Sequence, residues 1–126
     1  MINTRIIGKM GEDIATNYLV GLGYTLLARN YQKKWGEVDI IAQKTGIIHF
    51  FEVKSVRSDF SHVTNAHTPE ENVHPYKLKH ISRMIETFMF ERGKGMSPFQ
   101  FHVLTVRMDM LRRRARVCWF ENIIIW

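Results

Sequence analysis

The fold is decided by the stretch WGEVDIIAQKTGIIHFFEVKSV, residues 35–56. Two runs within it, residues 37–43 and 47–54, are rich in β-branched and aromatic side chains, and the intervening Lys44-Thr45-Gly46 segment has the composition of a turn. The stretch therefore predicts two neighbouring strands joined by a tight turn. Four charged residues interrupt these runs, although strands of this kind normally bury apolar side chains. They are Glu37, Asp39, Glu52 and Lys54.

The rest of the chain predicts two helices and three further strands around this hairpin. Residues 4–21 and a segment that starts at Pro75 and ends before Gly93 carry apolar residues at helical spacing. The predicted apolar faces are Ile7, Met10, Ile14, Tyr18 and Leu22 in the first helix, and Leu78, Ile81, Met84, Ile85, Phe88 and Met89 in the second. Gly8 and Gly11 are expected to permit close packing against a sheet. The strands are predicted at residues 24–31, 99–106 and 116–120.

The order of these elements, αβββαββ, defines the expected fold class. It is an α/β fold with a central mixed β-sheet flanked by helices. A chain of 126 residues has room for a single domain, residues 1–126, with its own hydrophobic core. Residues 58–74 predict a long loop, and its histidines at positions 62, 67 and 74 match no common zinc-ligand spacing. We therefore expect no zinc site there.

Alternation along the two hairpin strands predicts where the charged side chains point. Glu37 and Asp39 share one face of their strand, and Glu52 and Lys54 share a face of the next. A tight turn would then bring the carboxylates of Asp39 and Glu52 together beside Lys54. Such a cluster can bind Mg²⁺ or Mn²⁺ and serve phosphodiester hydrolysis, in which a lysine orients the nucleophile or steadies the developing charge.

The alternative to a metal site is a solvated sheet face on which Lys54 pairs with a carboxylate. The residues that flank Asp39 and Glu52 argue against this alternative, because they are typical of strands covered on both faces. These neighbours are Val38, Ile40, Ile41, Phe50, Phe51 and Val53. Charge in such surroundings needs a partner or a metal, so the pattern favours the metal site.

The charge balance points to a polyanionic partner. With 18 Lys and Arg against 12 Asp and Glu, the net charge is +6, which favours nucleic acid or an anionic surface. The candidate phosphate contacts are Lys33, Lys34, Arg57, Lys77, Arg112, Arg113 and Arg114. The alternative for the arginine-rich turn is a solvated segment that keeps the chain soluble. Trp35 could equally stack on a base or pack at the start of a strand.

The expected location follows from features that the sequence lacks. No run approaches the length of a membrane span, and the N-terminal residues lack the apolar core of a signal peptide. The one cysteine, Cys118, cannot form an internal disulfide, which suits a reducing compartment, and its apolar surroundings predict a small core residue. We therefore expect a cytoplasmic protein that does not bind a membrane.

Residues 8–57 carry four motifs in a specific order: G-E-x-x-A, R-N-Y, G-E-V-D-I-I-A and F-E-V-K. In these motifs the chain resembles the YraN-like family of small, largely uncharacterised bacterial proteins. That family is similar to archaeal Holliday-junction resolvases and to the restriction-endonuclease-like superfamily with its PD-(D/E)xK signature. The resemblance implies a restriction-endonuclease-like fold, with Asp39 and Glu52 as metal ligands and Lys54 as the catalytic lysine. It further implies that Glu12 on the first helix completes the acidic site, with Glu37 as an extra ligand.

The resemblance weakens after Arg57. Lys77 and Ile81 fit a K-x-x-x-I pattern loosely, and the family's Phe-Asp-Val is replaced by Phe101-His102-Val103. For Glu12, the residues alone favour an exposed helix position paired with Lys9 or Arg5.

Three hypotheses about function follow. The first is a Mg²⁺- or Mn²⁺-dependent endonuclease that hydrolyses DNA, with branched or recombination intermediates as the substrates that the resemblance implies. The second is a nucleic-acid-binding module that keeps the acidic pocket without turnover, and the third is a scaffold whose charge cluster is structural. A symmetric homodimer would suit an enzyme acting on two strands. The sequence leaves open whether the chain cuts nucleic acid or only binds it.

Overall fold

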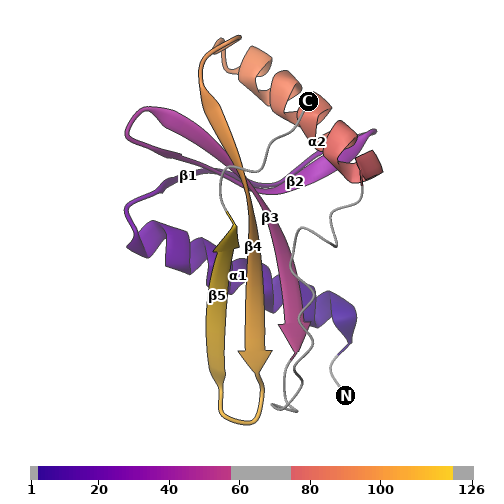
Figure 1. Cartoon of the computed structure of the whole chain (residues 1–126), viewed down its shortest axis with the longest axis vertical. Helices are drawn as coiled ribbons and strands as arrows, with labels where there is room; N and C mark the ends of the chain where they lie inside the picture. The colour runs from indigo at the N-terminus through magenta and orange to yellow at the C-terminus, as the bar shows by residue number, and fades with distance from the viewer. Residues whose placement is uncertain (1–2, 58–74, 121–126) are drawn as a thin grey trace.

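The computed structural model describes residues 3–57 and 75–120, with the side chains of residues 75–79 left outside the description. It contains two helices and five strands in the predicted order αβββαββ, which confirms the α/β fold class (Figure 1). The elements are α1 (Thr4–Gly21), β1 (Thr25–Lys33), β2 (Gly36–Lys44), β3 (Ile47–Arg57), α2 (Pro75–Glu91), β4 (Phe99–Asp109) and β5 (Arg114–Phe120). The predicted loop at residues 58–74, with its three histidines, lies outside the described residues.

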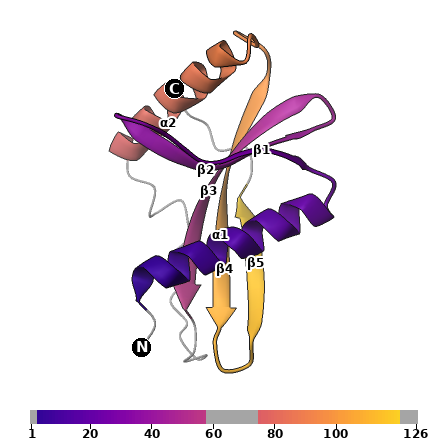
Figure 2. The same ribbon diagram turned by 180° about the vertical axis from the view of Figure 1, so that it is seen from behind.

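The five strands form one mixed sheet in the order β1-β2-β3-β4-β5. Neighbouring strands are antiparallel except β3 and β4, which are parallel because α2 connects them across the sheet. The helices lie on opposite faces of the sheet, as the two views in Figures 1 and 2 show. Each helix covers a separate hydrophobic cluster, so the central strands are buried on both sides.

Helix α1 packs on β3 along a narrow stripe of small residues. Its N-cap is Asn3, whose side chain accepts a 3.0 Å hydrogen bond from the backbone N–H of Ile6. The buried positions are Ile7, Gly11, Ala15, Thr16 and Leu19. The predicted stripe is therefore wrong at its end, since Tyr18 and Leu22 are 37% and 43% exposed. The buried face follows the small residues because they allow the helix to approach the sheet closely.

The two glycines of α1 behave differently. A Cβ built at Gly11 would lie 1.8 Å from the Oγ of Ser55 on β3, so only glycine fits at this crossing. A Cβ at Gly8 would meet no atom of residues 3–57 or 75–120 within 4 Å. The expected packing role is thus confirmed for Gly11 and wrong for Gly8.

Helix α2 buries the predicted apolar face. Ile81, Met84, Ile85, Phe88 and Met89 form a cluster with residues of β2, β3 and β4. Leu78 lies in the first turns, where side chains are not described. Neither described helix has the length and apolarity needed to cross a membrane.

The pairing between β2 and β3 ends about halfway along the two strands. Their ladder runs from the pair Lys44–Ile47 to the pair Ile40–Phe51. Strand β3 continues beyond it and pairs with β4 as far as Arg57, opposite Met108. The separation of the two strands leaves a notch beside β3. It begins at Asp39 and Glu52, the residues that follow the last pair of the ladder.

Candidate functional site

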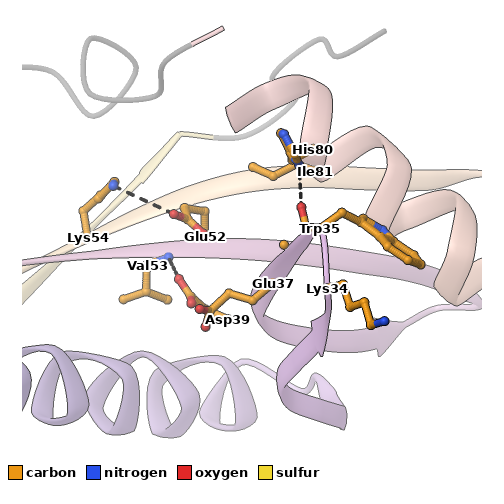
Figure 3. A pocket seen from close by; sticks show the side chains of 10 residues that line it. Lys34, Trp35, Glu37, Asp39, Glu52, Val53, Lys54, His80 and Ile81 are labelled. Carbon is orange, nitrogen blue, oxygen red and sulfur yellow. Dashed lines mark hydrogen bonds and ion pairs between the residues drawn. The ribbon is translucent and has the colours of Figure 1, made fainter. Parts of the chain in front are cut away.

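A pocket of about 710 Å³ lies at the notch between β2 and β3 (Figure 3). It contains the predicted acidic residues Glu37, Asp39 and Glu52 together with Lys54. The remaining lining residues are Lys34, Trp35, Gly36, Val53, His80 and Ile81. Most of this lining therefore comes from residues 35–56, and the described part of α2 contributes His80 and Ile81.

Asp39 is held at the edge of β3. The backbone N–H of Val53 donates a 2.7 Å hydrogen bond to Oδ2 of Asp39. In Figure 3 the side chains of Asp39 and Glu37 lie on the α1 side of β3, whereas Glu52 and Lys54 lie on the opposite side. The structure thus corrects the prediction that both carboxylates would share one face beside Lys54, although all three side chains line the same pocket.

The reason for this correction lies in β2. Val38 and Ile41 pack in the cluster under α2, while Ile40 and Ala42 pack in the cluster under α1. Residues two apart normally share a face, so the alternation is interrupted between Val38 and Ile40. Asp39 occupies that interruption, where the ladder to β3 has just ended.

Glu52 is the buried charge of the site, with 3% of the residue exposed. Its Oε2 lies 3.8 Å from the Nζ of Lys54, two residues along the same strand. Lys54 is half-buried, with 30% of its side chain exposed. The pair supplies the partner that a buried carboxylate requires, which is also what the structural alternative predicts.

Glu12 is fixed by two residues of β1. Its Oε1 accepts hydrogen bonds of 3.1 Å from Arg29 and 2.9 Å from Asn30. Arg29 also donates a 2.8 Å hydrogen bond to Asp13, and this bond is the main reason why its pKa is raised. The expected partners Lys9 and Arg5 are therefore wrong for Glu12, and Lys9 instead lies 3.8 Å from Asp13.

Glu12 belongs to a second pocket of about 490 Å³ on the α1 side. Asp39, Val53 and Lys54 line this pocket as well as the first. The other lining residues are Thr4, Ile7, Gly8, Ser55 and Arg57. The structure thus brings Glu12 into one pocket with Asp39 and Lys54, while Glu52 and Glu37 line the neighbouring one.

Three residues beside the first pocket were not predicted as a group. The Nδ1 of His80 on α2 donates a hydrogen bond to the backbone carbonyl of Trp35, since a carbonyl can only accept (Figure 3). The guanidinium of Arg83 lies 4.1 Å from the centre of the Trp35 ring. Trp35 therefore packs between the β1–β2 turn and α2. Its Nε1 is buried and has no hydrogen-bond partner in the part of the chain that the structure describes.

The predicted cationic contacts fall into several environments. Lys34 lines the first pocket and Arg57 the second. Lys33 lies 2.8 Å from Glu91 and is thereby tied to α2. The side chain of Lys77 lies outside the described part of α2.

The remaining cationic contacts lie at the turn between β4 and β5. Arg112 lies 3.2 Å from Asp109, whereas Arg113 and Arg114 are exposed. Oδ1 of Asp109 accepts the backbone N–H groups of Leu111 and Arg112, which fixes the turn. These hydrogen bonds hold the pKa of Asp109 below its usual value, and the backbone bond from Arg112 is the largest cause.

His102, which stands where the family resemblance predicts aspartate, faces away from the first pocket. It is buried in the α1-side layer against Phe51, Trp119 and His49. The replacement of the family's aspartate by His102 therefore affects the packing on the α1 side of the sheet.

The fold and the two pockets define a small α/β protein with an acidic site at the notch of a mixed sheet. The chain belongs to the uncharacterised protein family UPF0102, whose model matches residues 11–112. This finding confirms the resemblance to YraN-like proteins at the level of the family.

Several UPF0102 proteins are similar to the chain over most of its length. A UPF0102 protein of Sulfurovum is 38% identical over 106 residues, which cover 83% of this chain and 87% of the relative. One from Caldicellulosiruptor saccharolyticus is 36% identical over 110 residues, with 86% and 88% coverage. One from Campylobacter jejuni is 34% identical over 105 residues, with 83% and 87% coverage.

Proposed function

We propose that the protein is a Mg²⁺- or Mn²⁺-dependent endonuclease that hydrolyses phosphodiester bonds in DNA. The observation that carries the proposal is the presence of Asp39, Glu52 and Lys54 in one pocket. Branched or recombination intermediates are the substrates that the likeness of YraN-like proteins to junction resolvases suggests. A homodimer and a cytoplasmic location complete the proposal.

The donor set suits a hard divalent cation. Mg²⁺ is commonly held by one or two carboxylates, and waters and substrate phosphates complete its coordination. Asp39 and Glu52 provide two carboxylates in one pocket, and Glu37 lines the same pocket. Among the described residues, no three His, Cys, Asp or Glu side chains are grouped closely enough to hold an ion by themselves. A site that is completed by the substrate phosphate fits this arrangement.

The residues have separable roles in this proposal. Asp39 and Glu52 would hold the metal, which when bound polarises the phosphate and lowers the pKa of its water. Lys54 contributes a positive charge beside Glu52, where it can steady negative charge that develops on the phosphate oxygens. Arg29 and Asn30 position Glu12 in the adjoining pocket. The backbone N–H of Val53 orients Asp39.

A second candidate is a nucleic-acid-binding module without turnover. Two ion pairs favour this candidate, because they neutralise acidic residues of the pockets without a metal. Glu52 pairs with Lys54, and Glu12 pairs with Arg29. In such a module the cations at the pocket rims would contact phosphates, and affinity would fall steeply with salt.

The test is incubation of the purified protein with branched, single-stranded and linear duplex DNA. Mg²⁺, Mn²⁺ or a chelator would be present, and Asp39→Ala and Lys54→Ala would be compared with the wild type. Glu86→Gln is the matched control, since Glu86 is an exposed carboxylate of α2 outside both pockets. Metal-dependent cleavage that both alanine variants lose and the control keeps would support the nuclease. Salt-sensitive binding without cleavage by the wild type would support the binding module instead.

A further inference from the structure

Gly8 is a helix-interior glycine without a packing reason. Glycine within a helix costs about 0.5–1 kcal/mol relative to alanine. The close contact of Gly11 with Ser55 explains the glycine there, whereas a Cβ built at Gly8 would meet no atom of the described residues within 4 Å. Gly8 also lines the second pocket. A side chain at position 8 would therefore reduce the pocket without disturbing the packing of α1.

The second pocket has the chemistry of a phosphate site. Its lining includes the cations Lys54 and Arg57 and the hydroxyls of Thr4 and Ser55. Guanidinium and hydroxyl groups are common donors to the phosphates of nucleic acids. The two carboxylates of the pocket, Glu12 and Asp39, are each engaged by donors of the protein. The lining therefore offers positively charged and hydroxyl donors that a ligand phosphate can contact, in addition to their contacts within the protein.

The two pockets are continuous in their lining. Asp39, Val53 and Lys54 belong to both, at the notch where the ladder of β2 and β3 has ended. From these shared residues, one pocket extends toward His80 of α2 and the other toward Gly8 of α1. A polynucleotide strand, whose phosphates recur at each unit, can lie across both pockets and present a phosphate at the residues that they share.

We propose that the second pocket binds the phosphate next to the scissile one in a single polynucleotide strand, and that Gly8 leaves the space which this strand fills. The inference rests on the proposed function for the nature of the polymer and adds the path of the strand across the notch. Arg57 and the hydroxyls of Thr4 and Ser55 contact the flanking phosphate. The next nucleotide on the other side extends toward Trp35.

The experiment measures binding separately from cleavage. Fluorescence anisotropy of labelled single-stranded DNA is recorded with Ca²⁺, which takes the same oxygen ligands as Mg²⁺ in looser geometry. Gly8→Leu is compared with Asn17→Leu, which adds the same side chain at an exposed position of α1. We expect Gly8→Leu to weaken binding roughly tenfold, equivalent to about 1.4 kcal/mol, and Asn17→Leu to leave it unchanged.

Two further variants keep the result interpretable. Gly8→Ala should raise the midpoint of thermal unfolding, because alanine favours the helix, and should still weaken binding. Arg57→Gln should lower the slope of log affinity against log salt by about one, as expected for one lost phosphate contact. The difference in affinity between Gly8→Leu and the wild type should be smaller for a short oligonucleotide that fills one pocket than for a long one.

The outcomes separate the inference from the proposed function. Equal binding of the long strand by Gly8→Leu and the wild type overturns the inference, and a wild type that cleaves DNA then leaves the nuclease standing. Weaker binding by Gly8→Leu with no cleavage by the wild type supports the strand path and rejects the nuclease. Failure of the wild type to bind single-stranded DNA at low salt also overturns the inference.

Discussion

Asp39 and Val53 are joined across the notch by a hydrogen bond of 2.7 Å from the backbone N–H of Val53 to Oδ2 of Asp39. The bond follows directly after the last residue pair between β2 and β3. It gives Asp39 a structural role in addition to the role proposed for it in metal binding. The two roles can be separated by substitution, because an amide oxygen can accept the same hydrogen bond but is a poor substitute for a charged ligand.

We expect Asp39→Asn to retain nearly wild-type stability while losing Mg²⁺-dependent cleavage. Asp39→Ala should lose cleavage and also about 1–3 kcal/mol of unfolding free energy, since the N–H of Val53 loses its acceptor. Urea unfolding measures the stability, and Mn²⁺ titration followed by water-proton relaxation measures metal binding. Wild-type affinity for Mn²⁺ in both variants would exclude Asp39 as a ligand.

Gly11 provides a test of the close contact between α1 and β3. Gly11→Ala should destabilise the protein by roughly 1–3 kcal/mol, because its Cβ would lie 1.8 Å from the Oγ of Ser55. Combining it with Ser55→Gly should recover part of the loss, since both Ser55 side-chain atoms that obstruct the methyl group are removed. The measurement is urea unfolding of the single variants and the double variant. Additive losses in the double variant would contradict this contact.

The buried histidines should make stability depend on pH. The N–H of Trp119 donates to Nδ1 of His102 at 3.2 Å, and Nε2 of His102 lies 2.8 Å from Nδ1 of His49. With Nδ1 accepting, neutral His102 carries its proton on Nε2 and donates it to His49. Burial, followed by the charge of His49, lowers the pKa of His102 from 6.5 to about 4.

The sign of this dependence follows from proton binding. Between the two pKa values the unfolded chain binds the proton and the folded protein does not, so unfolding free energy rises with pH in that window. The contribution of neutral His102 to the unfolding free energy is complete above pH 6.5. It is lost as the pH falls toward 4, by up to about 3 kcal/mol. Urea unfolding across this range measures it, and His102→Leu should flatten the profile. An equally steep profile in that variant would assign the effect to other groups.

The arginine-rich turn and Lys33 should differ in their response to nucleic acid. Arg113 and Arg114 are exposed at the turn, so Arg113→Gln and Arg114→Gln should each lower the salt slope of DNA binding by about one. Lys33→Gln is the matched control, because Lys33 is already paired with Glu91 at 2.8 Å. Anisotropy at several salt concentrations gives the slopes. Equal slopes for all variants and the wild type would show that the turn does not contact phosphates.

The arrangement of elements follows from the sequence because apolar periodicity marks each helix and strand. The ends of the strands are harder to predict from the sequence. Strands β3 and β4 extend to Arg57 and Asp109, beyond the predicted residues 54 and 106. Arg114 precedes the strand predicted at residues 116–120, yet it is the first residue of β5. These terminal residues are polar, and they join the sheet through backbone pairing that does not depend on the side chain.

The candidate site was predictable in its membership and not in its geometry. The hairpin pattern predicts that Asp39 and Glu52 converge beside Lys54; all three residues line one pocket, but Asp39 lies on the other side of β3 from Glu52 and Lys54 (Figure 3). The interruption of alternation beside Asp39 leaves no signature in the sequence, because Val38, Ile40 and Ile41 are equally apolar. The contacts of Glu12 with Arg29, and of His80 with Trp35, arise only when the helices dock on the sheet.

The parallel pairing of β3 with β4 has a consequence for how the protein folds. Glu52 lies beside Val103, a residue that is synthesised long after it, whereas β1, β2 and β3 follow one another directly. Closing a long loop before gaining its contacts slows folding, so the meander with α1 can form first and β4 later. Most of the lining of both pockets would then exist on a nascent chain before the sheet is complete, and the arrival of α2 would add His80 and Ile81 to the first pocket.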